Sequence, residues 1–346
     1  MMRTLLIACL FSLADVAAGP RWQMPGGKTI DGEVREVFGS LVFIHGQRGN
    51  TFLPAEKMTD EELGRVADFL VRRGAESAPW SKSSSRVAKS LRGRLQVLRN
   101  GELASFDPAT RPEPDIYLVY FSAGWCAPCH RFTPELVKAY RRYQELAPGR
   151  VEVVFVSSDR SAGEQERYVR EFNMPWPVLE FSSVGRADAI ERWAGSGIPC
   201  LVGLTRDGDV MMHSYRGQEY LGPDQVLEAC DQLLPFVMGR TTSVKIARHR
   251  LEVLRHVRSA GTGSVQLQPY VIGLPADRYR EIRVPRVELI LTVDEQGRVT
   301  EVDFEEGSTG YNLKRMLTED VQRWLFLPGV VDGHARATKV KVPVVL

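Results

Sequence analysis

The sequence has few cysteines, no marked excess of charge and no long apolar run. Five cysteines in 346 residues are too few for a fold held together by disulfides, so any sulfur chemistry is local. A net charge of +2 without a long basic tract gives no reason to expect nucleic acid or an acidic membrane as a partner. The apolar stretch near the N-terminus is shorter than the about 20 residues that span a bilayer, so we expect no transmembrane segment.

Residues 1–18 have the layout of a secretory signal peptide. A positively charged start is followed by a nearly continuous apolar segment and by small residues before Gly19. We therefore expect the mature chain to be exported, to a bacterial periplasm. The residues up to Cys9 also resemble a lipoprotein cleavage box, but the apolar segment ahead of Cys9 is very short and apolar residues continue after it. Export without a lipid anchor on Cys9 is the favoured interpretation.

Three folded units are predicted along the rest of the chain. Residues 21–75 contain short apolar runs and then an acidic helix start, which predicts a small β-rich accessory module. Residues 76–90 are rich in serine and basic residues, which indicates a linker. Alternating strand and helix patterns over 91–240 predict a layered α/β domain. A helix with a Gly/Ser break over 241–264 leads to the last unit, 265–346, with a predicted hairpin, helix and final strand.

The two outer units resemble known interaction modules. Residues 21–72 resemble the Sla-type homology domain 1, a small β-barrel of exported bacterial proteins, through Trp22, a glycine-containing turn and the segment after Leu53. The segments LILTVDEQGRVTEVDF, RWLFLPGVVDG and VKVPVVL, over about 285–346, resemble the TonB C-terminal fold. That second resemblance implies contacts with other envelope proteins. No binding role is inferred for the N-terminal module.

Residues 124–130, GWCAPCH, permit two kinds of chemistry. Two cysteines separated by two residues can cycle between a dithiol and a disulfide, whereas the same pair followed by histidine is the attachment signature of a c-type haem. An apolar run over 116–121 predicts a buried strand before the motif, and helical spacing of apolar residues follows it. The start of that helix would stabilise the thiolate of Cys126. Cys129, one turn later, would then be the resolving thiol.

Four ordered segments resemble thioredoxin-fold proteins and, most closely, the tryparedoxin/nucleoredoxin branch. They are YFSAGWCAPCHRFTPELVKAY, VEVVFVSSDR, MPWPVLEF and GIPCLVGLTRDG, and they lie within about 110–220. The resemblance implies a cis peptide bond before Pro199, with Ile198 offering backbone hydrogen bonds to a bound peptide or thiol. It also implies that Trp125 flanks the nucleophile and that Trp176 lines the same face, so all four are expected to bind substrate.

Five residues in or near the motif are candidates for tuning the reduction potential. Ala127 stands where this branch usually has proline, so the dipeptide between the cysteines is altered. Tyr120 occupies the position of a buried aspartate in ordinary thioredoxins, and Cys200 stands where threonine is usual after the cis-proline. His130 is expected on the solvent side of the helix, where its protonated form would favour the thiolate. The full set of candidates is Ala127, Pro128, Tyr120, His130 and Cys200.

Two alternatives to thiol chemistry remain open. The domain could be a non-catalytic envelope scaffold, or CAPCH could carry a haem with His130 as an axial ligand. Thiol chemistry is favoured because it accounts for the strand, for Trp125 and for the Gly-Ile-Pro segment together. We therefore expect an exported thiol–disulfide oxidoreductase without cofactor or metal, which exchanges with envelope proteins and with an electron donor or acceptor. Cys200 and Cys230 are expected as buried core residues. The predicted fold class is α/β, with a thioredoxin-like central domain between a small β-barrel-like module and a TonB C-terminal-like α+β module.

Overall fold

The computed structural model describes residues 19–24, 26–46, 49–73, 79–108, 111–238, 242–260, 270–272, 287–305 and 311–344. The chain forms two compact units, and each unit is assembled from two stretches of sequence. The first unit comprises 1–58 with 75–244, and the second comprises 59–74 with 245–346. The signal peptide predicted at 1–18, including Cys9, lies outside the described residues.

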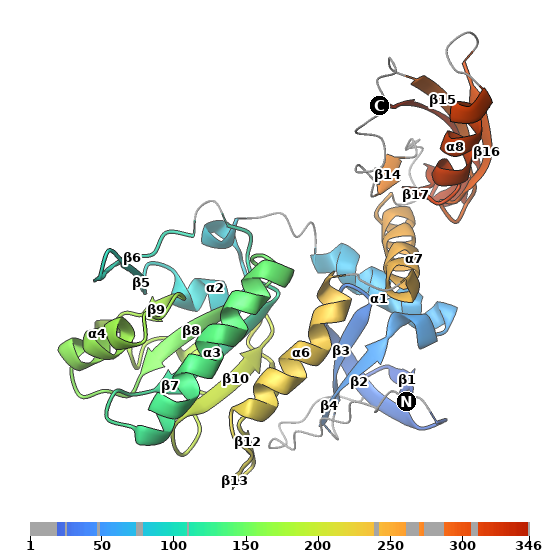
Figure 1. The fold of residues 1–346 in the computed structure, drawn as a ribbon. Coiled ribbons are helices and arrows are strands. Elements are labelled where there is room, and N and C mark those ends of the chain that lie inside the picture. Colours follow the sequence, from blue (N-terminus) through green and yellow to red (C-terminus); the bar gives the residue numbers. More distant parts are fainter. Residues whose placement is uncertain are drawn as a thin grey trace. The chain divides into compact units, whose positions relative to one another are not determined.

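A seven-stranded sheet forms the framework of the first unit (Figure 1). Its order is β11-β10-β7-β8-β9-β5-β6. The central strands β7 and β8 run parallel and are buried at every position, as their continuous apolar sequences predicted. The strands are β5 Leu95–Arg99, β6 Glu102–Ser105, β7 Ile116–Ser122, β8 Val151–Ser157, β9 Val178–Leu179, β10 Cys200–Leu204 and β11 Val210–His213.

Helices cover both faces of this sheet, because a strand directs successive side chains to opposite faces. Leu118 and Tyr120 of β7 enter a core shared with α3, α4 and α6, whereas Tyr117 and Val119 enter a second core with α2 and α5. The mixed α/β class predicted from the sequence is confirmed. The helices are α2 Arg86–Leu91, α3 Ala127–Leu146, α4 Ala162–Glu171, α5 Asp188–Glu191 and α6 Asp224–Met238, with 3-10 turns at Ala55–Lys57, Trp80–Lys82 and Phe181–Ser183.

Part of the linker predicted at 76–90 is folded instead. Trp80 is only 3% exposed and contributes to the second core of the sheet. The hydroxyls of Ser83 and Ser85 both donate to the buried carboxylate of Glu113, and Ser85 also caps helix α2. The serines that indicated a linker therefore share with the Tyr117 hydroxyl the task of satisfying a buried carboxylate.

A four-stranded antiparallel sheet belongs to the same unit as the seven-stranded sheet. Phe43 and Phe52 of this sheet contact each other and join the core that contains Leu234 of α6. Asn50 donates from Nδ2 to the carbonyl oxygen of Val210 at 2.7 Å, and so contacts β11 at the edge of the central sheet. The strands pair in chain order and are β1 Arg21–Gln23, β2 Thr29–Phe38, β3 Leu41–Gly46 and β4 Gly49–Pro54.

The second unit contains a three-stranded sheet with a helix against it. β15 pairs antiparallel with β16 and β20, and its alternate side chains meet Leu317 and Val321 of α8 in one core. The hairpin, helix and final strand predicted for this part of the chain are present. These elements are β14 Tyr270–Ile272, β15 Val287–Val293, β16 Val299–Phe304, α8 Tyr311–Val321, β17 Leu325–Leu327, β18 Gly329–Val331, β19 His334–Arg336 and β20 Thr338–Val344.

Two further helices complete the second unit, α1 Asp60–Arg73 and α7 Thr242–Ser259. Asp60 and Asp68 of α1 form ion pairs with Arg250 and Arg258 of α7, respectively. Thr59 caps the start of α1, because its hydroxyl accepts from the backbone N–H of Glu62, the third residue of the helix. Within the described ranges, no helix combines the length and apolar character needed to cross a membrane.

Candidate functional site

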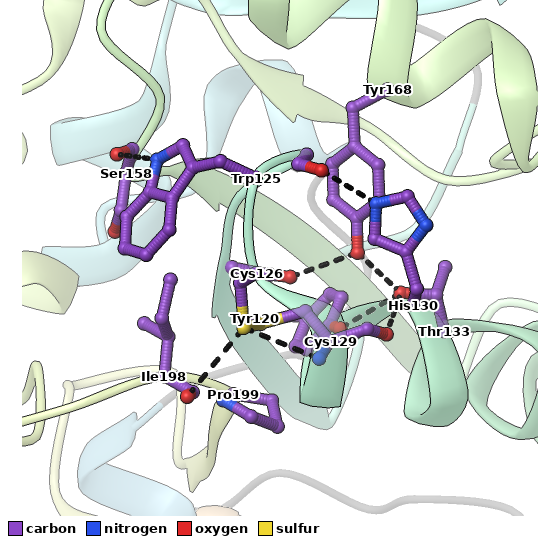
Figure 2. Close-up of a disulfide and its surroundings, with 12 residues drawn as sticks. Tyr120, Trp125, Cys126, Cys129, His130, Thr133, Ser158, Tyr168, Ile198 and Pro199 are labelled. Atoms are coloured by element: carbon purple, nitrogen blue, oxygen red, sulfur yellow. Dashed lines mark hydrogen bonds between the residues drawn. A yellow bond between two sulfur atoms is a disulfide. The ribbon is translucent and has the colours of Figure 1, made fainter.

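The two cysteines of the GWCAPCH motif lie where β7 ends and α3 begins (Figure 2). Cys126 is the N-cap residue of α3 and Cys129 lies in its first turn. The two residues form a disulfide, with their Cα atoms 5.2 Å apart. The backbone N–H of Cys129 points at the Cys126 sulfur, 3.2 Å away. This N–H group of the first helical turn therefore faces the sulfur, where it favours a negative charge.

The two cysteine residues differ in exposure. Cys126 is 5% exposed, whereas Cys129 is fully buried. Ala127 and Pro128, between the cysteines, are exposed. Pro128 lies in the first turn of α3, where a missing N–H leaves no helix hydrogen bond unmade.

The loop before β10 lies opposite the motif. Ile198 and Pro199 are joined by a cis peptide bond, which confirms the bond that the sequence resemblance implied. The Ile198 carbonyl oxygen is 3.7 Å from the sulfur of Cys126. Figure 2 shows this sulfur between the indole ring of Trp125 and the Ile198–Pro199 loop. The pairing of β10 with β7 brings the loop there, since Cys200 and Phe121 are register partners.

Hydrogen bonds from three directions hold the turn at Gly124 and Trp125. The Gly124 N–H donates to the Asp159 carboxylate at 2.8 Å, and the Gly124 carbonyl lies 2.6 Å from Nε2 of His130. The Trp125 indole N–H donates to the Ser158 carbonyl oxygen at 3.2 Å. Asp159 was not singled out from the sequence, although it lies within the VEVVFVSSDR segment that carried part of the resemblance.

His130 is half-buried beside α4, with 34% of its side chain exposed. Its ring stacks on Tyr168 at 5.4 Å between centroids and meets Phe172 edge-on, because α4 covers this face of the helix. Its Nδ1 atom lies 3.6 Å from the Glu171 carboxylate. Its Nε2 atom is hydrogen-bonded to the Gly124 carbonyl, and the two cysteine sulfurs are bonded to each other.

A chain of buried hydroxyl groups lies beside Cys129. The Thr133 hydroxyl is 2.9 Å from that of Tyr120 and 2.6 Å from that of Tyr168, and it donates to the Cys129 carbonyl oxygen. The Tyr168 hydroxyl is also 3.0 Å from that of Ser122. Burial raises the pKa of Tyr120 well above its usual value, so the side chain stays neutral. A neutral hydroxyl thus stands where ordinary thioredoxins carry a carboxylate.

Three other residues singled out from the sequence belong to the core. Trp176 does not line the face around the disulfide, because it is fully buried against the ring of Tyr140 at 5.6 Å. Cys200 and Cys230 are free and fully buried, as expected. Burial raises the pKa of the Cys200 thiol to about 11 and that of Cys230 to about 12, so neither is a thiolate at neutral pH. Across the described residues, no group of three or more His, Cys, Asp or Glu side chains is arranged to hold a metal ion.

Comparisons with known proteins place this site in a family. Residues 114–210 match the family model described as thioredoxin-like. Nucleoredoxin of Danio rerio is 38% identical over 179 residues, which cover 50% of this chain and 41% of that protein. Nucleoredoxin of Homo sapiens is 39% identical over 99 residues, which cover 28% of this chain and 22% of that protein. The matched segments therefore span less than half the length of these relatives.

Solved structures of thioredoxin-fold proteins also match. A thioredoxin from Wuchereria bancrofti is 28% identical, with 40% of this chain and 94% of that chain covered and a TM-score of 0.31. Tryparedoxin II complexed with glutathionylspermidine is 27% identical, with 38% and 90% covered and a TM-score of 0.31. The family match, the nucleoredoxin relatives and the disulfide at the start of α3 agree. Residues 114–210 therefore form a thioredoxin-like domain that is similar in sequence to nucleoredoxins.

Proposed function

We propose that this chain is a thiol–disulfide oxidoreductase in which Cys126 attacks and Cys129 resolves. The observation that carries the proposal is the position of Cys126 at the start of α3, with the Cys129 N–H directed at its sulfur. An N–H group in this position stabilises the thiolate, which is the reactive form of the thiol. The difference in exposure supports the division of roles, because only Cys126 is partly accessible. The membership of residues 114–210 in a thioredoxin-like family supports the same chemistry.

The proposed reaction starts from the reduced pair. The Cys126 thiolate attacks one sulfur of a substrate disulfide, so that a mixed disulfide forms and the other substrate sulfur leaves as a thiolate that takes up a proton. Cys129 then loses its proton and attacks the Cys126 sulfur, which releases the second substrate thiol and closes the Cys126–Cys129 disulfide. The substrate gains two electrons and the pair loses two. A donor dithiol would restore the pair, and an acceptor would drive the reverse reaction.

We further propose that the exchange takes place in the cell envelope. Support for export comes from the layout of residues 1–18, and an envelope protein that contains a thiol or disulfide would then be the substrate. The second unit, with its β16-β15-β20 sheet, is proposed to contact other envelope proteins. The competing proposal is a scaffold that keeps the fold without exchanging thiols. The two proposals differ in whether the disulfide cycles.

Trapping of mixed disulfides tests the proposal. In Cys129→Ser the resolving step is blocked, so substrates should accumulate as adducts on Cys126 that a thiol reductant releases. The double variant Cys126→Ser/Cys129→Ser is the matched control and should trap nothing. Alkylation of the wild-type chain after reduction and after oxidation should show both cysteines cycling. A pair that stays inert to reductant and oxidant, together with no adducts, would favour the scaffold.

A further inference from the structure

Exposed aromatic side chains occur in only one region of the described structure. Five large apolar side chains are exposed across the described residues, and two of them are aromatic: Trp125 at 58% and Tyr220 at 49%. Single exposed apolar residues are common on protein surfaces and need no explanation. These two, however, lie near the same disulfide although they are 95 positions apart in the chain. Trp and Tyr are also the residues that most often dominate binding energy at interfaces.

Tyr220 is bound directly to the loop that faces Cys126. Its hydroxyl donates to the carbonyl oxygen of Pro199 at 2.9 Å. The preceding carbonyl, that of Ile198, lies 3.7 Å from the Cys126 sulfur. The two contacts are therefore one residue apart along the loop. Trp125 lies on the opposite side of the sulfur from this loop (Figure 2).

A short hairpin holds Tyr220 in this position. Strands β12 Tyr215–Arg216 and β13 Glu219–Tyr220 pair antiparallel and extend from the end of the sheet where β10 begins (Figure 1). Tyr215 and Tyr220 are register partners in this hairpin, and their ring centroids are 5.0 Å apart. Tyr215 packs so closely over Gly195 that a Cβ atom there would lie 2.2 Å from its ring. The buried ring of Tyr215 thus supports both the loop and the exposed ring of Tyr220.

We propose that Tyr220 is a substrate-contacting residue, and that Trp125 and Tyr220 together select a cysteine within a polypeptide flanked by apolar side chains. This inference rests on the proposed thiol exchange and names its substrate class. Cys126 is only 5% exposed, and its sulfur lies between Trp125 and the loop that Tyr220 holds (Figure 2). A substrate cysteine that reaches it must bring its flanking residues against these features. Apolar flanking side chains would bury the two exposed rings, whereas a small disulfide would leave much of their surface in water.

Two probes of different size test this proposal on the reduced full-length chain. Both are mixed disulfides of thionitrobenzoate, one with a short peptide whose single cysteine lies between leucines and one with 2-mercaptoethanol. The Cys126 thiolate attacks the sulfur of the peptide or of mercaptoethanol, and thionitrobenzoate leaves with the electron pair as a coloured thiolate. The rate of colour release gives kcat/KM for each probe.

Three variants are compared with the wild type. Tyr220→Ala should lower kcat/KM for the peptide by about tenfold and change the mercaptoethanol probe by less than about twofold. Tyr220→Phe keeps the ring but loses the bond to Pro199, and it should retain at least about half of the peptide rate. Val184→Ala, which removes an exposed apolar side chain of the same unit, is the matched control and should change neither rate.

Each other outcome overturns one defined claim. Equal losses with both probes in Tyr220→Ala, or no loss with either, would overturn the substrate contact. A loss in Tyr220→Phe as large as in Tyr220→Ala would show that the hydroxyl acts through Pro199, and would also overturn a contact by the ring. A wild-type chain that reacts with neither probe would refute the thiol exchange itself, which separates the two failures.

Discussion

Glu152 provides a test of the core of the first unit that is independent of the disulfide. The residue lies on β8 and is 3% exposed. Its carboxylate accepts a hydrogen bond from the Tyr140 hydroxyl at 2.8 Å, and the Arg111 guanidinium lies 3.7 Å away. Burial disfavours the charged form more than these partners favour it, and raises the pKa of Glu152 from 4.5 to about 7.

The direction of the pH effect follows from this raised pKa. Below about pH 4.5 the carboxyl is protonated in both the folded and the unfolded chain, so burying it carries no cost for a buried charge. Between 4.5 and about 7 the unfolded chain ionises while the folded chain keeps its proton, so stability falls as pH rises. Above about 7 both states are ionised and the loss is complete, at about 3 kcal/mol in the free energy of unfolding.

The variant Glu152→Gln removes this titration and keeps the size of the side chain. Its free energy of unfolding relative to the wild type should rise by about 3 kcal/mol between about pH 4 and about pH 8. Urea unfolding of both chains at several pH values measures the difference, in which the titrations common to both chains cancel. A difference that stays constant over this range, or that falls, would refute the reasoning from burial.

Substitutions at three further positions test the frame around the site. Asp159→Ala removes the acceptor of the Gly124 N–H and should slow thiol exchange by about tenfold. Asp159→Asn keeps an acceptor and should slow exchange less. Equal rates in the two variants would contradict a positioning role for Asp159. Gly195→Ala should lower the midpoint of thermal unfolding by several degrees, because its Cβ atom would meet the Tyr215 ring, and an unchanged midpoint would contradict the close packing. Tyr120→Phe removes one neutral hydroxyl, so it should lower the free energy of unfolding by about 1 kcal/mol in denaturant unfolding and leave thiol exchange in place. Loss of exchange in this variant would show that Tyr120 has a larger role.

Local pattern was sufficient to predict the main elements of the central sheet. The strand expected at 116–121 spans Ile116–Ser122, and the helix after the cysteines begins at Ala127. Apolar runs and helical spacing depend only on residues close together in sequence, so they can be recognised without knowledge of tertiary contacts. Composition was a poorer guide at 76–90, where serines indicated a linker. Their partner Glu113 is about 30 positions away, and such a contact leaves no local signal.

The candidate site was predictable only where a motif specified it. The cysteine pair and the cis bond at Pro199 followed from ordered segments of sequence, and both are present. Tyr220 was missed because its relation to Pro199 depends on a hairpin that returns the chain to the loop 21 positions later. Trp176 was expected beside the disulfide because the family resemblance implied it, but its packing against Tyr140 places it in the core.

The interleaving of the two units decides how the protein can be divided. Helix α1 follows the four-stranded sheet in sequence but belongs with α7, to which it is joined by the ion pairs of Asp60 and Asp68. A fragment that stops after residue 240 would keep the cysteines but leave Asp60 and Asp68 of α1 without the arginines of α7 that pair with them. A shortened chain that preserves the first unit would instead replace 59–74 with a short connection and retain 1–58 and 75–244. The order of elements in the sequence is thus a poor guide to which fragments of this chain preserve a complete unit.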